Sequence, residues 1–192
     1  MSALFLDGAP ELLVLTDTDP YYREALQQRF EGRQDVVVEE LTLPDYTAGI
    51  RFQEFRLDTV VALNVIEHIA GDVEALRCIR DMLQPQGRAV ILVPALEGLF
   101  GSLDSALGHQ RRYTRRSITE RMRQAGFRVE RVFYFNMLGT FGWWLNARIR
   151  RVPRIPLAQL RSFDRLVPIL RTEDLIRLPF GQSVIAVGAV DG

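Results

Sequence analysis

The sequence predicts an α/β fold built on a doubly wound, mostly parallel sheet. Short runs of apolar, β-favouring residues alternate with segments whose apolar residues recur at helical spacing, which is typical of that class. The last two apolar runs, 127–135 and 183–190, predict an antiparallel hairpin. A chain of 192 residues with 47% hydrophobic and 25% charged residues suits a single domain over residues 1–192.

The first elements follow from short local signals. Residues 1–10 have the pattern of the last turns of a helix, closed by Gly8 and stopped by Pro10. Residues 11–16 predict a strand, and Asp19 predicts a helix N-cap with Pro20 in the first turn. The apolar side chains of this helix fall on one face, namely Tyr22, Ala25, Leu26 and Phe30.

The middle of the chain continues the alternation. Residues 36–40 predict a strand, 41–57 loop and short helix, and 59–63 a central strand. Asp72 can cap a helix whose apolar residues are Val73, Leu76, Ile79 and Leu83. A further strand at 88–93 ends at Pro94.

The last elements are a loop, a helix and two strands. Residues 95–113 predict a loop, and Thr114 predicts the cap of a helix that points Ile118, Met122 and Ala125 inward and ends at Gly126. The two strands of the expected hairpin follow.

Composition excludes lysine chemistry, because all 24 basic residues other than histidine are Arg. Residues 1–60 hold 12 acidic residues against 5 Arg, whereas residues 109–165 hold 14 Arg against 3 acidic residues. This polarity fits attraction of an anionic acceptor or a phospholipid surface, but solvated helix faces are the preferred interpretation. No nucleic-acid partner is expected.

A single cysteine, Cys78, fits a reducing compartment because it cannot form an internal disulfide. We see no signal peptide and no apolar run long enough to span a bilayer. A cytoplasmic location is therefore expected.

Polar residues gather directly after the central strand. Asn64, Glu67 and His68 follow the apolar run, where parallel α/β sheets place their ligands. A helix start, or a hydrogen-bonded structural histidine, is the alternative interpretation.

Residues 58–136 resemble the class I S-adenosylmethionine-dependent methyltransferases of the small-molecule type. The resemblance rests on the motif Asn64-Val65-Ile66-Glu67-His68-Ile69 and on the segments 82–88 and 108–114, in that order. It implies a Rossmann-like fold, S-adenosylmethionine as cofactor and methyl transfer to a small molecule, with O-methylation favoured.

The resemblance also implies where the cofactor binds. Asp17 and Thr18, at the end of an early strand, would face the ribose, and a turn role for Asp17 is the alternative. Leu41 and Thr42, beside Glu40, would lie near the adenine. Asn64 and Val65 would line the cofactor pocket.

The same resemblance implies acceptor chemistry. His68 is the preferred general base, with Glu67 beside it, because imidazole titrates near neutral pH. His109 would be a second acid or base, and Arg112 with Tyr113 would clamp the acceptor; a purely structural loop is the alternative. Two side chains do not make a metal site, so no metal is predicted, and metal binding by Glu67 and His68 is the minor alternative.

The sequence lacks the glycine-rich turn and the first strand of the family. In the family's strand order, 3-2-1-4-5-7-6, that strand lies between the 11–16 and 59–63 strands. We therefore expect an N-terminally incomplete, truncated domain in which these strands close up, another segment or another chain fills the gap, or stability is poor.

Two other functions stay open. A methyltransferase-like binding or scaffold protein without activity could dock to a partner or membrane through Trp143 and Trp144. A nicotinamide-dependent oxidoreductase is disfavoured because the sequence has no G-x-G-x-x-G motif.

Overall fold

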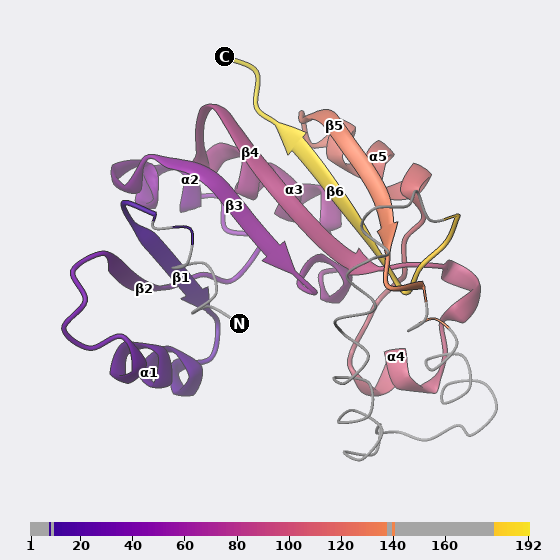
Figure 1. Cartoon of the computed structure of the whole chain (residues 1–192), viewed down its shortest axis with the longest axis horizontal. Helices are drawn as coiled ribbons and strands as arrows, with labels where there is room; N and C mark the ends of the chain where they lie inside the picture. The colour runs from indigo at the N-terminus through magenta and orange to yellow at the C-terminus, as the bar shows by residue number, and fades with distance from the viewer. Residues whose placement is uncertain (1–7, 9, 138–139, 141–178) are drawn as a thin grey trace.

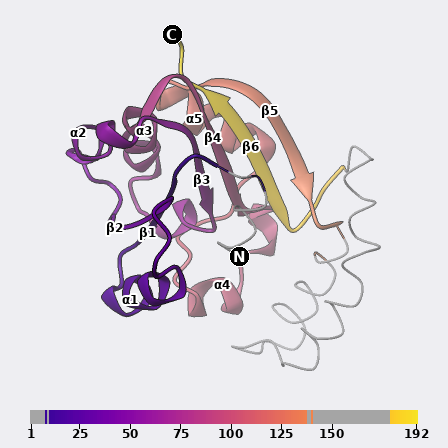
Figure 2. The same ribbon diagram turned by 60° about the vertical axis from the view of Figure 1, so that its left-hand side comes forward.

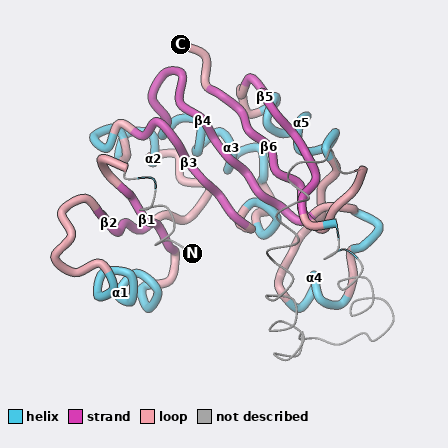
Figure 3. The backbone as a smooth tube through the Cα atoms, viewed as in Figure 1, coloured by secondary structure: helices cyan, strands magenta, loops and turns pink. Residues whose placement is uncertain are grey.

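The computed structural model describes residues 8, 10–137, 140 and 179–192. Within them the strands form two separate sheets, a two-stranded sheet β1–β2 and a four-stranded sheet in the order β3-β4-β6-β5. Figure 1 shows the two sheets side by side, with the helices packed around them, and Figure 3 shows the gap that separates their strands. The predicted α/β class is confirmed.

The small sheet and its helix form the β1–α1–β2 unit. Strand β1 (Leu13–Asp17) runs parallel to β2 (Val36–Glu40), and α1 (Pro20–Arg29) connects them. The Asp19 side chain caps α1 by accepting the backbone N–H of Tyr21 at 2.9 Å, as predicted. No residue of α1 is buried, and of the apolar face predicted for this helix only Phe30, at the C-cap, is buried, whereas Tyr22 is 56% exposed.

The remaining elements belong to the four-stranded sheet and its connections. They are α2 (Ala48–Arg51), η2 (Gln53–Phe55), β3 (Leu57–Leu63), η3 (Ile66–His68), α3 (Asp72–Met82), β4 (Leu83–Pro94), η4 (Glu97–Leu99), α4 (Ser102–Ala106), α5 (Arg115–Gln124), β5 (Arg128–Phe135) and β6 (Ser183–Ala189). Strand β3 is parallel to β4, whereas β6 is antiparallel to both β4 and β5. The predicted C-terminal antiparallel pairing is confirmed.

The core lies between this sheet and two helices. Helices α3 and α5 cover the same face of the sheet in Figure 1 and Figure 2. The sheet contributes Ile91 and Val184 to the core, and the helices contribute Leu76 and Ile118; all four are 0% exposed. Each such side chain stabilises the fold by about 1.5–3 kcal/mol relative to an exposed position.

Two predicted details differ in the structure. Gly71, not Asp72, is the N-cap of α3, and Asp72 is a buried first-turn residue that accepts a hydrogen bond from the Tyr113 hydroxyl at 3.0 Å. The segment 95–113 is not only loop: it contains η4 and α4, and a parallel bridge between Ala95 and Tyr113 joins its two ends. Thr114 does cap α5, accepting the backbone N–H of Ser117 at 3.0 Å.

Strands β1 and β3 do not pair with each other. A cavity of about 690 Å³ lies between them, lined by residues of both strands together with Phe52 and Met82. The expectation that these strands close up is therefore wrong, and no described segment fills the gap. That the domain is truncated stays a prediction.

The described helices are too short or too polar to cross a bilayer. Cys78 is buried and forms no disulfide. Trp143 and Trp144 lie outside the described residues, so docking through them stays a prediction.

Candidate active site

The predicted polar residues lie where parallel strands end. The β1 and β3 arrows point the same way in Figure 1, so Asp17 and the Asn64–His68 segment lie at the same end of their respective sheets. They do not share one sheet, because β1 and β3 are unpaired. Asn64 has a φ of 54°, a left-handed turn that an Asn tolerates, and it directs the chain from β3 into η3.

Helix η3 positions the Glu67 and His68 side chains. Ile66 is 0% exposed and anchors this turn in the core, while Glu67 also points inward and His68 outward. Glu67 and His68, which the resemblance pairs, thus project from the same short turn into different environments, one buried and one exposed.

His109 joins them from the distant segment 95–113. The backbone N–H of Gln110 donates to the Glu67 carbonyl at 2.8 Å, which fixes this segment against η3. The His68 and His109 rings meet edge to face, with centroids 4.8 Å apart. The structure therefore brings together the three residues predicted to be catalytic.

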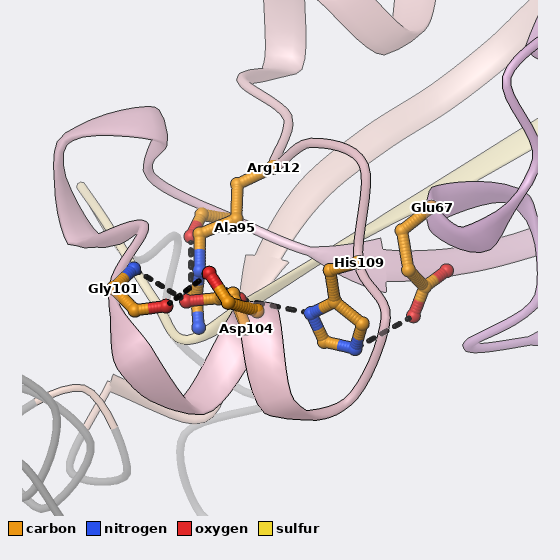
Figure 4. A network of polar contacts seen from close by, with 7 residues as sticks. Glu67, Ala95, Gly101, Asp104, His109 and Arg112 are labelled. Atoms are coloured by element: carbon orange, nitrogen blue, oxygen red, sulfur yellow. Dashed lines mark hydrogen bonds and ion pairs between the residues drawn. The ribbon is translucent and has the colours of Figure 1, made fainter. Parts of the chain in front are cut away.

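Asp104, on α4, holds His109 in place (Figure 4). Its carboxylate accepts from the Gly101 backbone N–H at 3.0 Å, from Arg112 Nε at 2.8 Å and lies 2.8 Å from His109 Nδ1. Burial raises the pKa of Asp104, but the hydrogen bond to His109 and the charge of Arg112 outweigh it and lower this pKa below its ordinary value. Asp104 is thus an anion that orients the His109 ring.

Glu67 is the least satisfied of these groups. Its side chain is fully buried, and neither carboxylate oxygen has a hydrogen-bond partner. Its nearest ion-pair contact is His109 Nε2, at 4.0 Å from Oε1. Burial raises the pKa of Glu67 to about 7, although the nearby Glu67 backbone N–H and then the charges of His109 and Arg112 lower it in part.

His68 is exposed at the edge of the same group. Partial burial, followed by the charge of His109, lowers the pKa of His68 below its ordinary value. A neutral imidazole can accept a proton, so the position suits a base that reaches solvent or an acceptor.

The candidate cofactor residues lie at the strand ends and are accessible. Asp17 is half-buried, and its Oδ1 accepts the Asp19 backbone N–H at 2.9 Å, which is the turn role of the alternative interpretation. Thr18 and Thr42 are exposed, and Leu41 is half-buried. Asn64 and Val65 are exposed at the end of β3, where Val65 leaves 38% of its surface uncovered.

Arg112 and Tyr113 lie inside the protein. Arg112 is 3% exposed and also donates to the Ala95 carbonyl at 2.8 Å, and Tyr113 is 1% exposed. These contacts match the structural alternative. Clamping of the acceptor by Arg112 and Tyr113 stays a prediction.

Comparison with known proteins gives the family. The family model described as "Methyltransferase domain" matches residues 12–132, which include every candidate site residue. The chain belongs to the methyltransferase domain family. Its fold is that of solved S-adenosylmethionine-dependent methyltransferases. No functionally curated protein matches the methyltransferase significantly.

Solved structures share its fold at low identity. The trans-methyltransferase CalH, in complex with S-adenosylhomocysteine, is 19% identical with a TM-score of 0.56 over 93% of this chain. Phosphoethanolamine N-methyltransferase 2 of Haemonchus contortus, in complex with S-adenosylmethionine, is 17% identical with a TM-score of 0.57 over 99%. The chain spans 42% of CalH and 46% of the Haemonchus enzyme.

A shorter relative in fold is the S-adenosylmethionine-dependent methyltransferase of Mesorhizobium loti. It is 12% identical with a TM-score of 0.55, and the match covers 93% of this chain and 80% of that one.

Two residues of this methyltransferase, Asp17 and Val65, have chemistry that suits the adenosine part of S-adenosylmethionine. A partly exposed carboxylate, Asp17, can accept protons from both ribose hydroxyls, and exposed apolar surface at Val65 suits a nucleoside. Among the described residues, no strand lies in the gap between β1 and β3, and the glycine-rich turn that would follow such a strand is therefore missing as well.

Asp104 is the site residue that the sequence interpretation missed. Its signal was weak, because an acidic residue in a segment predicted as loop resembles any solvated turn residue. Only the short helix α4 and the turn back to His109 bring this carboxylate to the imidazole.

Proposed function

We propose that this methyltransferase transfers a methyl group from S-adenosylmethionine, its cofactor, to a small-molecule acceptor, with a hydroxyl oxygen as the favoured atom. One observation supports the proposal: Glu67, His68 and His109 converge at the carboxyl end of β3, where an unpartnered carboxylate faces two imidazoles. Such a group can hold and remove the proton that a hydroxyl must lose before it attacks a methyl carbon.

The cofactor supplies a methyl group bound to a positively charged sulfur. Asp17 would bind its ribose, and Asn64 with Val65 would bind beside it at the end of β3. His68, which is exposed, would receive the acceptor's proton, while His109, with the buried Glu67 behind it, would orient the hydroxyl.

Cofactor binding is tested by calorimetric titration with S-adenosylhomocysteine. We expect Asp17→Asn to weaken binding by about tenfold, because an amide accepts from the ribose hydroxyls less strongly than a carboxylate. Asp81→Asn, which removes an exposed carboxylate on α3, is the matched control and should bind like the wild type. Absence of binding by the wild-type chain would contradict the proposal and favour the non-catalytic scaffold.

Acceptor chemistry is tested with labelled S-adenosylmethionine and a panel of small phenols, amines and thiols. Phenols should be methylated fastest, and His68→Ala should lower kcat by about 10²–10⁴-fold while leaving S-adenosylhomocysteine affinity unchanged. Faster turnover of amines than of phenols would contradict the hydroxyl acceptor and show that the enzyme methylates nitrogen.

A further inference from the structure

The Glu67, His68 and His109 side chains have the composition of a metal site. Their ligand atoms, one from each residue, all lie within 4.8 Å of one another. His68 and His109 are the only two histidines of the chain. Two imidazole nitrogens and one carboxylate oxygen are a ligand set that zinc and related divalent transition metals prefer.

Asp104 determines which His109 nitrogen can bind an ion. The Asp104 carboxylate is an acceptor only, so the 2.8 Å contact requires His109 Nδ1 to carry the proton. In the neutral ring, Nε2 then has a lone pair, and Figure 4 shows this atom directed toward Glu67. A carboxylate that fixes an imidazole in this way is the usual outer partner of a metal-binding histidine.

Two acceptors therefore face each other inside the protein. His109 Nε2 and Glu67 Oε1 are 4.0 Å apart, which is too long for a hydrogen bond even if the ring carries a second proton. Both Glu67 oxygens are buried without a hydrogen-bond donor. Such a carboxylate is costly in its ionised form unless a cation accompanies it.

We propose that Glu67, His68 and His109 bind one divalent transition-metal ion, with Zn²⁺ as the reference ion and Asp104 as the group that orients His109. In a tetrahedral site with bonds of about 2.1 Å, ligand atoms stand about 3.4 Å apart. The three ligand atoms, which lie within 4.8 Å of one another, would have to approach to that distance when an ion binds.

Three protein ligands leave a coordination position for another oxygen. The use of that position by an acceptor hydroxyl rests on the proposed function, whereas ion binding does not. The ion would stabilise the deprotonated acceptor oxygen. With the ion bound, His68 is a ligand and no longer the proton acceptor, so this oxygen would release its proton to solvent. The oxygen would form the bond to the methyl carbon as the carbon–sulfur bond breaks, which yields the methyl ether and S-adenosylhomocysteine.

The test is a Co²⁺ titration of tag-free protein, followed by visible absorption, with Zn²⁺ as competitor. We expect one Co²⁺ per chain, with d–d absorption that Zn²⁺ abolishes. Glu67→Gln, which keeps the side-chain shape, should weaken binding at least tenfold, and Asp104→Asn should weaken it by about 10–100-fold. Glu74→Gln, an exposed carboxylate on α3, is the matched control and should leave binding unchanged.

Thermal unfolding of each variant shows whether it is folded, and His109→Gln serves as a second ligand variant. Absence of Co²⁺ absorption in the wild type, or equal affinity in folded Glu67→Gln, would overturn the metal site. Binding of S-adenosylhomocysteine and phenol methylation that resist chelators would leave the proposed function standing. Ion binding without any methyl transfer would support the metal site and contradict the proposed function.

Discussion

The β1–α1–β2 unit and the four-stranded sheet contain similar apolar strands in unequal surroundings. Strand β4 has a neighbour on each side, and several of its residues, among them Ala89, Ile91 and Val93, are 0% exposed. Strands β1 and β2 have only each other among the described strands, and neither contains a buried residue. Burial of a strand in a parallel sheet thus depends on flanking strands and covering helices. An apolar run in the sequence is not sufficient for it.

The largest difference between the two regions should come from their ion pairs. Arg112 and Asp104 are both buried, so Arg112→Met removes the permanent positive charge beside a buried carboxylate and should lower the free energy of unfolding by about 3–5 kcal/mol. In the small unit, Glu40 is 61% exposed in its pair with Arg23, and Glu40→Gln should cost about 0–1 kcal/mol. Urea denaturation of both variants measures the contrast, and equal costs would show that burial does not separate the regions.

Core truncations should give an intermediate effect. Ile91→Ala removes a fully buried side chain from β4 and should cost about 2–5 kcal/mol. Leu15→Ala removes a partly exposed side chain that borders the cavity between β1 and β3, and it should cost about 1 kcal/mol. Thermal and urea unfolding provide the comparison. A larger cost at Leu15 would mean that the cavity is closed in solution.

Helix caps should give the smallest effect. Thr114→Ala removes the cap of α5 and should lower the free energy of global unfolding by about 1 kcal/mol. Asp19→Ala removes the cap of α1, which has no buried residue, so it should mainly speed hydrogen exchange of β1, α1 and β2 amides. Hydrogen exchange measured by mass spectrometry distinguishes the effects of the two substitutions. Uniformly faster exchange across the chain in Asp19→Ala would argue that both regions unfold together.

The local elements could be predicted because their signals are short-range. The Asp19 and Thr114 caps depend on the next two or three residues, and the strands at 36–40 and 59–63 on a few β-branched side chains. The exposure of α1 could not be predicted, because it depends on what lies beside β1. Periodicity describes a helix face but does not show what covers it.

The site could be predicted only in part for a similar reason. Glu67, His68 and His109 were found from motifs, and the structure brings them together. The buried, unpartnered state of Glu67 and the Asp104 contact to His109 arise from backbone packing of distant segments, such as the Gln110 bond to the Glu67 carbonyl. No residue pattern records such an arrangement.

The bridge between Ala95 and Tyr113 has a consequence for how this protein can diversify. Because the two ends of the intervening segment pair with each other, changes in the residues around η4 would leave the entry to α5 and the end of β4 in place. Insertions or deletions there can reshape the walls around a bound molecule while Glu67 and His68, which lie outside this segment, keep their positions. Related chains could thus acquire new acceptors by altering one tethered excursion, without rebuilding the scaffold beneath it.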